Sequence, residues 1–142
     1  MPPIDTAVFY ISGHGFGHAS RQIEIINALR AIRPDLRIVV RTSAPRWLFD
    51  LTVTRPFSFA HGEPDTGVVQ IDSLQVDAAA SIDRAWDFHR TLDARAKAEA
   101  RLLESHDATL VAGDIPPLAF AAAAAAGVPA VAIGNFTWDW IY

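Results

Sequence analysis

The chain has 142 residues, of which 51% are hydrophobic and 20% are charged, and this balance fits one globular domain and excludes intrinsic disorder. The formal net charge is -4 and the basic residues are scattered, so the sequence lacks the clustered Lys and Arg of a nucleic-acid-binding surface. The absence of cysteine excludes disulfides and thiolate metal ligands, and it fits a cytoplasmic location.

The first half of the chain predicts strands that alternate with helices. No basic segment precedes the first apolar run, so we expect no signal peptide. The first predicted helix has apolar side chains at helical spacing, with Ile25, Leu29 and Ile32 on one face that Ile26 extends, and Pro34 ends it. The predicted elements of this half are a strand at 6–13, a helix at 18–32, a strand at 36–43 and a short helix at 44–53.

The second half continues the alternation. Two segments with alternating apolar residues predict strands with one wet face, and a long helix follows, with Trp86 expected in the core. The apolar run at 117–134 is interrupted by Gly127 and Pro129, so it predicts a helix, a turn and a strand, and no membrane span. The predicted elements are strands at 57–62 and 67–77, a helix at 81–106, a strand at 108–114, a helix at 116–127 and a strand at 129–135.

Continuous apolar strands that alternate with helices are typical of a parallel sheet covered on both faces. We therefore expect an α/β, Rossmann-like domain of three layers with a mostly parallel sheet. The whole chain, residues 1–142, is predicted to form this one domain. It ends in an aromatic segment, 136–142, which resembles the entry to a further part of a protein or a surface for homodimer formation.

The loop after the first strand is the strongest functional signal. In open parallel sheets, ligands bind beyond the carboxyl ends of the strands, where this loop lies. Three glycines let the backbone come close to a ligand, and amides at the start of the next helix can meet an anion. The spacing differs from the G-x-G-x-x-G of dinucleotide folds, which argues against NAD. The candidate ligand-binding residues of the loop are Gly13, His14, Gly15, Phe16 and Gly17.

Two histidines flank the end of this loop. His14 and His18 have a spacing that can bind a metal, but the loop offers no third ligand, so we predict no metal site. His14 is expected to cap or to pack. His18 opens the helix at the ligand edge, where a neutral imidazole can take a proton from a hydroxyl. Asp114 ends a later strand at the same edge and can orient that imidazole, or it can cap the next helix.

Other polar residues are candidates for ligand binding, each with a structural alternative. Arg21 can hold a phosphate or carboxylate, or pair with Glu24 one turn later. Thr42 can donate to a ligand or cap the following helix. Trp138 can stack on a sugar or lie in a domain interface. The candidates after the last strand are Asn135, Trp138 and Asp139.

The segment "SGHGFGHASR" resembles the first glycine loop of GT-B glycosyltransferases, in the G-x-G-H-x-x-R variant of MurG-like enzymes. Three stretches widen the likeness. They are "YISGHGFGHASRQIEIINAL", "GVVQIDSLQVD" and "GDIPPLAFAAAAAAGVPAVAIGNFTWDWIY". Together they resemble the glycosyltransferase-like amino-terminal region of L-arabinokinases and their free-standing bacterial relatives.

The resemblance implies one half of a GT-B fold, the half that binds the acceptor. It implies an inverting hexosyltransferase-type enzyme that uses a nucleotide sugar, a UDP-sugar by analogy, with His18 as base and Asp114 as its orienting residue. The donor-binding domain is absent from these 142 residues, so we expect little turnover and no cofactor bound by this domain alone. The expected partners are a hydroxyl-bearing acceptor and the donor domain, and peripheral membrane contact is compatible. The alternatives are a non-catalytic sugar or nucleotide-sugar binding module and a docking or dimerising domain.

Overall fold

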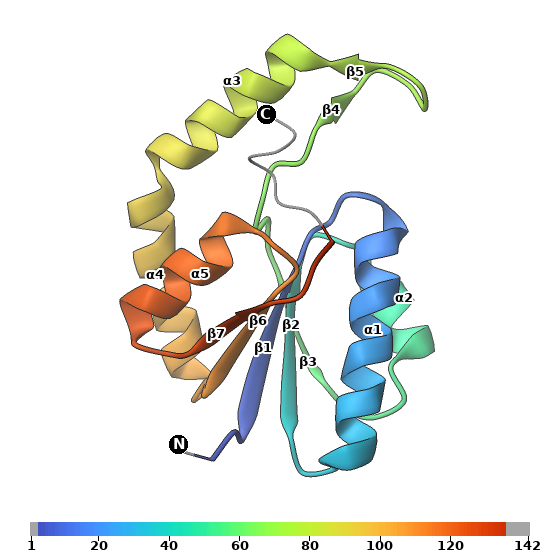
Figure 1. The fold of residues 1–142 in the computed structure, drawn as a ribbon, viewed down its shortest axis with the longest axis vertical. Helices are drawn as coiled ribbons and strands as arrows, with labels where there is room; N and C mark the ends of the chain where they lie inside the picture. The colour runs from blue at the N-terminus through green and yellow to red at the C-terminus, as the bar shows by residue number, and fades with distance from the viewer. Residues whose placement is uncertain (1–2, 136–142) are drawn as a thin grey trace.

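The computed structural model describes residues 3–135 as a parallel sheet between helices (Figure 1). The sheet has five strands in the order β3-β2-β1-β6-β7, and all its pairings are parallel. The predicted α/β, Rossmann-like class is confirmed. The elements are β1 (Thr6–Ile11), α1 (Gly15–Ile32), β2 (Arg37–Thr42), α2 (Arg46–Thr52), β3 (Ser58–His61), β4 (Val69–Gln70), β5 (Val76–Asp77), α3 (Ala78–Arg90), α4 (Leu92–Ser105), β6 (Leu110–Gly113), α5 (Pro117–Ala126) and β7 (Ala130–Ala132).

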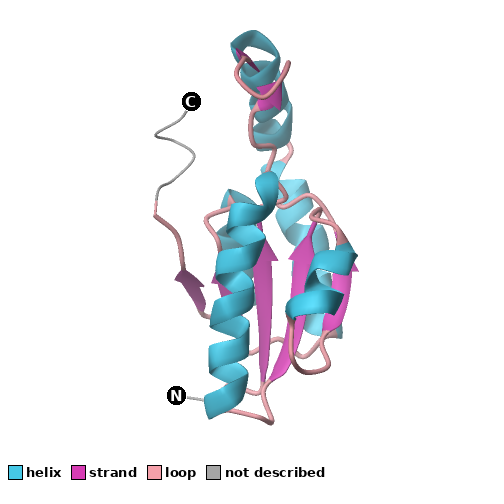
Figure 2. Ribbon diagram, turned by 90° about the vertical axis from the view of Figure 1, so that its right-hand side faces the viewer, coloured by secondary structure: helices cyan, strands magenta, loops and turns pink. Residues whose placement is uncertain are grey.

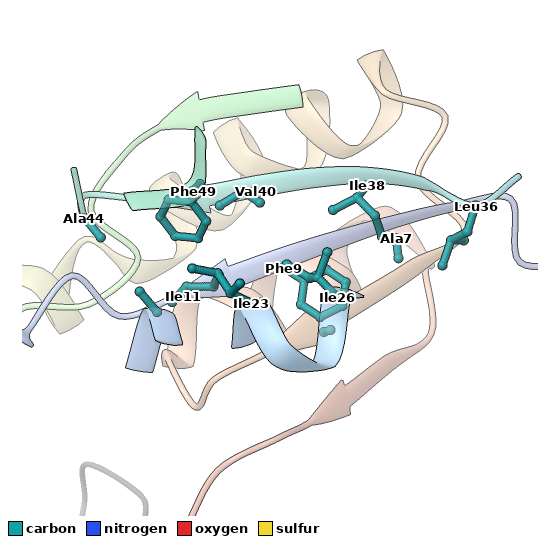
Figure 3. Packing of buried hydrophobic residues seen from close by; sticks show 12 residues of the cluster. Ala7, Phe9, Ile11, Ile23, Ile26, Leu36, Ile38, Val40, Ala44 and Phe49 are labelled. Carbon is teal, nitrogen blue, oxygen red and sulfur yellow. The ribbon is translucent and has the colours of Figure 1, made fainter. Parts of the chain in front are cut away.

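The central strand β1 is buried along its whole length because helices cover both faces of the sheet (Figures 1 and 2). Successive side chains of a strand point to opposite faces. Phe9 and Ile11 therefore pack with Ile23 and Ile26 of α1 (Figure 3). Val8 and Tyr10 face the other layer, where they pack with Leu103 of α4 and with the alanines of α5. This two-sided burial explains why β1 reads as an apolar run without alternation.

The face predicted for the first helix is confirmed at Ile26, which is buried, and wrong at Ile32, which is exposed. α1 begins at Gly15, three residues before the predicted start at His18, and its solvent side includes the exposed Ile32. Ile25 and Leu29 lie only at the border of the buried face. The buried residues are Ala19, Gln22, Ile23, Ile26 and Arg30. Two of them are polar, so the apolar pattern alone indicates a face rotated from the true one.

The predicted helix at 81–106 is two helices, α3 and α4, which meet at Thr91. The Thr91 hydroxyl donates to the Asp87 carbonyl at 3.0 Å, so it satisfies a carbonyl at the end of α3. Trp86 was expected in the core, but it is 71% exposed. Because α3 projects beyond the sheet, only one narrow stripe of it is covered, and Phe88 lies in that stripe (Figure 1).

The predicted strand at 67–77 forms a short hairpin outside the main sheet. β4 and β5 pair antiparallel, with Gln70 opposite Val76. The Asp72 carboxylate accepts from the amides of Leu74 and Gln75, which closes the turn between them. The hairpin continues into α3, because Asp77 caps that helix by accepting from the Ala80 amide.

The last part of the described chain follows the prediction. α5 starts with proline and ends at Gly127, which is in the left-handed region at φ 67°. Strand β7 lies at the sheet edge, beside β6. Within residues 3–135, no helix combines the length and the apolar character needed to cross a membrane. The candidates Trp138 and Asp139, and the predicted homodimer surface at 136–142, lie outside the described residues.

Candidate active site at the carboxyl edge of the sheet

The two residues with predicted acid–base roles lie in direct contact. His18 Nδ1 is 2.7 Å from Asp114 Oδ2. His18 lies in the first turns of α1, directly after β1, and Asp114 directly follows β6. β1 and β6 are adjacent and parallel, so their carboxyl ends meet at one edge of the sheet. The expectation that this edge joins the two side chains agrees with the geometry.

The backbone holds Asp114 in place before its side chain makes any contact. Its amide donates to the Tyr10 carbonyl at 2.9 Å, which continues the pairing of β6 with β1. The next residue, Ile115, has φ 53°, a conformation that is rare for a β-branched residue. The chain therefore turns sharply after Asp114. The N-cap of α5 is Pro116, so the side chain of Asp114 does not take the capping role that we considered.

Arg21 is the second partner of the Asp114 carboxylate. Its Nη2 lies 2.7 Å from Asp114 Oδ1, and its Nη1 donates to Asn135 Oδ1 at 3.1 Å. Asp114 is 0% exposed, so both of its oxygens are paired away from water. The alternative in which Arg21 pairs with Glu24 is not found among the described residues, where Arg21 pairs with Asp114 instead. Arg21 and Asn135 therefore lie at the site through protein contacts, and their roles in ligand binding stay predictions.

The contacts of Asp114 determine which ring nitrogen of His18 carries a proton. A carboxylate has only acceptor atoms, so a 2.7 Å contact with it requires a hydrogen on His18 Nδ1. In the neutral ring the basic lone pair is then on Nε2. This is the arrangement in which a histidine accepts a proton at Nε2 while an acid holds its other nitrogen.

The three glycines have two kinds of environment. Gly15 has φ 67°, and a Cβ on Gly15 or on Gly17 would meet no atom of residues 3–135 within 4 Å. With respect to the described residues, the chain is open at these two positions. Gly13 is different, because a Cβ there would overlap the Ser43 hydroxyl. Gly13 thus allows the first loop to pack against the turn after β2.

His14 is partly buried, whereas Phe16, two residues later, is exposed. A Cβ on Gly67 would overlap the His14 ring, so the imidazole packs closely against the backbone of Gly67. This agrees with the expectation that His14 packs. Phe16 is exposed and packs edge to face with Trp47 of α2, with ring centroids 5.8 Å apart.

The loop after β3 belongs to this edge, although the sequence interpretation did not include it. Asp65 and Thr66 are buried, and Asp65 Oδ1 accepts from the Ser12 hydroxyl at 3.3 Å. Ser12 in turn accepts from the amide of His14 at 3.4 Å. The signal for this loop was the segment "EPDTG" at 63–67, a turn sequence directly after a predicted strand.

Thr42 has a local contact. It is buried, and its hydroxyl accepts from the Ala44 amide at 3.0 Å, which shapes the turn before α2. The alternative in which Thr42 caps the helix is wrong, because α2 begins at Arg46 with Pro45 as its N-cap and without a side-chain capping hydrogen bond. Among residues 3–135, no group of three His, Cys, Asp or Glu side chains is placed to hold one metal ion.

No protein-family model matches the chain. Among curated proteins, L-arabinokinase from Arabidopsis thaliana is 37% identical over 136 residues, which cover 94% of this chain. The chain spans only 13% of the length of that relative. The similarity therefore joins this chain to one segment of a much longer protein.

Solved structures share the fold at low sequence identity. A UGT transferase from Siraitia grosvenorii, solved in complex with UDP, has a TM-score of 0.59 at 18% identity, over 90% of this chain and 27% of its own. CalG4, the calicheamicin glycosyltransferase, has a TM-score of 0.60 at 18% identity, over 90% of this chain and 32% of its own. The C-terminal domain of the PF1911 hydrogenase from Pyrococcus furiosus has a TM-score of 0.53 at 16% identity, over 93% of this chain and 92% of its own.

At these identities the structural matches establish the fold alone, and the fold is shared with a protein of another name and activity. The two transferases match over about a third of their length or less, so the likeness concerns one domain of them. Common ancestry is inferred from the sequence similarity to L-arabinokinase. The chain is a homologue of one segment of L-arabinokinase and has the fold of a GT-B glycosyltransferase-like domain.

Proposed function

We propose that this chain is the acceptor-binding half of an inverting glycosyltransferase that uses a nucleotide sugar. The observation that carries the proposal is the 2.7 Å contact between His18 Nδ1 and the buried Asp114 carboxylate at the carboxyl edge of the sheet. That pair provides a positioned base at the edge where open parallel sheets bind ligands. The homology with an L-arabinokinase segment and the GT-B-like fold support it.

The proposed reaction is a single displacement. His18 Nε2 takes the proton of an acceptor hydroxyl as that oxygen attacks the anomeric carbon of the donor sugar. The new carbon–oxygen bond forms while the bond from the anomeric carbon to the phosphate oxygen breaks, and the nucleoside diphosphate leaves with the electron pair. Attack from the face opposite the leaving group inverts the anomeric centre. Asp114 stabilises the imidazolium that forms on His18.

The glycine loop is the proposed wall toward the donor phosphates. No atom of residues 3–135 lies within 4 Å of a Cβ built at Gly15 or Gly17, and α1 begins there with no acidic residue in its first turn. Amides at the start of a helix favour a negative group. UDP is the proposed nucleotide because one of the structures that share the fold was solved with it. The acceptor would approach from the side of His18.

His18→Ala in the native gene product tests the role of the base. We expect transfer to fall by at least about 100-fold, the usual contribution of a general base, while the folded state remains. His89→Ala is the matched control, because His89 lies exposed on α3, away from the dyad. Release of the nucleoside diphosphate, followed with a panel of sugar donors and acceptors, gives the rate. Unchanged transfer in His18→Ala would refute the mechanism.

A non-catalytic sugar or nucleotide-sugar binding module is the second candidate. The exposed pair of Phe16 and Trp47 favours it, because aromatic faces bind sugar rings and bases without any chemistry. Calorimetric titration with nucleotide sugars distinguishes the two candidates. Binding that is lost in Phe16→Ala but unchanged in His18→Ala and Asp114→Asn, without transfer to any acceptor, would support the module.

A further inference from the structure

The Asp114 carboxylate is shared between a group that is always charged and a group that can change its charge. Arg21 Nη2 contacts one oxygen at 2.7 Å, and His18 Nδ1 contacts the other at 2.7 Å. We propose that Arg21 is a positioning residue whose charge balances Asp114 and thereby keeps His18 neutral, able to accept a proton. The inference rests on the proposed function, in which His18 is the base.

The charge balance of a buried site supports this role. A carboxylate that is 0% exposed is strongly unfavourable without a countercharge. Among residues 3–135, two groups that contact Asp114 can supply one, the Arg21 guanidinium and a protonated His18. With Arg21 in place, the pair is already neutral. A protonated ring would then add a second positive charge 3.4 Å from Arg21 Nη2.

The placement of Arg21 is not explained by the stability of its helix. Arg21 is the seventh residue of α1, beyond the first turn in which the helix dipole acts, and it is far from the last turn, where a cation is favoured. Its Nε is buried and, among the described residues, makes no hydrogen bond, which is unfavourable. Its two terminal nitrogens contact Asp114 and Asn135. The placement of Arg21 is therefore explained by its contact with the Asp114 carboxylate.

The same contacts distinguish this role from ligand binding. An arginine that holds a phosphate presents its paired terminal nitrogens to the ligand. In Arg21 one of these nitrogens contacts Asp114 and the other donates to Asn135, in the loop after β7. The guanidinium thus connects α1 to the loops after β6 and β7. The protein itself therefore orients the guanidinium, and this orientation requires no ligand.

The charge state of His18 is directly measurable. We would label the histidines of the chain with nitrogen-15 and record long-range proton–nitrogen spectra at neutral pH. The expected spectrum of the parent chain shows a neutral His18 ring with its proton on Nδ1. Arg21→Gln is expected to give an imidazolium at His18, and Arg21→Lys, which keeps the charge, a neutral ring. A parent chain with a charged His18, or a neutral His18 in Arg21→Gln, would overturn the proposal.

The double variant Arg21→Gln/Asp114→Asn is the matched control. It removes both charges together, so the need for a countercharge disappears and His18 is expected to be neutral again. An imidazolium that persists in the double variant would contradict the charge-balance explanation. The parent spectrum needs no substitution, so the proposal stays testable even where Arg21→Gln alone does not fold.

Kinetics separate this inference from the proposed function. We expect Arg21→Gln to lower kcat by about 10- to 100-fold with little change in KM for the acceptor, and to have no further effect in a His18→Ala background. Transfer that survives His18→Ala refutes the proposed function whatever the spectra show. Transfer lost in His18→Ala, with a neutral His18 in Arg21→Gln, refutes only the role of Arg21.

Discussion

His18 Nδ1 and Asp114 Oδ2 lie 2.7 Å apart although 96 residues separate them in the chain. The contact exists because β1 and β6 are neighbours in the sheet and each of the two residues follows one of them. One oxygen of the carboxylate faces the imidazole and the other faces Arg21. A substitution at Asp114 leaves the His18 side chain in place, so it tests how the proposed base is oriented without removing that base.

Asp114→Asn keeps the size of the side chain and removes its charge. We expect transfer to fall by about 100-fold or more, because an amide can donate to His18 Nδ1 and so favours the other neutral ring form, whose proton is on Nε2. The nitrogen-15 spectrum should show that exchange of the proton directly. Retention of the Nδ1 proton in Asp114→Asn, with normal transfer, would contradict the orienting role.

Tyr10, Glu99 and Arg41 form a polar cluster on the face of the sheet that α4 and α5 cover. The Tyr10 hydroxyl donates to Glu99 Oε2 at 2.9 Å, and Arg41 Nε donates to the same atom at 3.0 Å. Glu99→Ala leaves both donors without this acceptor, so we expect the free energy of unfolding to drop by about 3 kcal/mol. Glu104→Ala, exposed on the same helix, should change it by less than about 0.5 kcal/mol. Urea denaturation measures both variants.

The same cluster predicts a loss of stability in alkali. Burial, and secondarily the Glu99 carboxylate, raises the pKa of Tyr10 well above its ordinary value. The folded protein therefore holds this proton more tightly than the unfolded chain does. The resulting stabilisation is fully present below about pH 10, the ordinary pKa of tyrosine, and decreases as the pH rises above it.

Tyr10→Phe is the test of that alkaline dependence. Below the ordinary pKa of tyrosine the variant should be about 1 kcal/mol less stable, because it loses one hydrogen bond. Above it, the difference from the parent chain should shrink. Thermal unfolding of both proteins as a function of pH gives the comparison, and two parallel curves would count against a role for the Tyr10 proton.

The close packing of Gly13 against Ser43 predicts that a side chain at position 13 destabilises the fold, and that a smaller residue at position 43 reduces this loss. A Cβ at Gly13 would overlap the Ser43 hydroxyl, and it would lie 3.3 Å from the Ala44 amide nitrogen. We expect Gly13→Ala to destabilise the fold by about 1–3 kcal/mol. Ser43→Gly in the same chain should recover part of this loss. Purely additive effects in this double-mutant cycle would show that the two sites do not interact.

Gly17 offers the opposite test, because a Cβ there meets no atom of the described part of the chain within 4 Å and the residue is already helical. Gly17→Ala should leave the fold unchanged or stabilise it by up to about 1 kcal/mol. Under the proposed function it should weaken donor binding, since the methyl group would stand on the open side of the loop. If the variant is more stable and binds the donor normally, the donor does not bind at this side of the loop.

Trp86 and Phe88 lie two residues apart on α3 and should respond very differently. Trp86 is 71% exposed and Phe88 is 4% exposed. We expect Trp86→Ala to change the free energy of unfolding by less than about 1 kcal/mol, and Phe88→Ala to lower it by about 3 kcal/mol. A large loss in Trp86→Ala would restore the core role that the sequence pattern indicated.

The sequence by itself determined the kind and order of most elements. Apolar runs, helical spacing and the positions of proline and glycine act locally, so they indicated the strands of the main sheet and the start and end of α5. They also placed His18 and Asp114 at one edge, because the carboxyl ends of parallel strands meet there. The glycine loop was recognisable for the same local reason.

Tertiary structure alone decided which side chains are covered and which partners they have. The break at Thr91 and the exposure of Trp86 depend on where α3 leaves the sheet, which no local pattern contains. The pairing of Arg21 with Asp114, rather than with Glu24 one turn away, depends on a residue 93 positions later, at the end of β6. A buried carboxylate recruits whichever cation the fold brings near it, and proximity of that kind is a property of the folded chain.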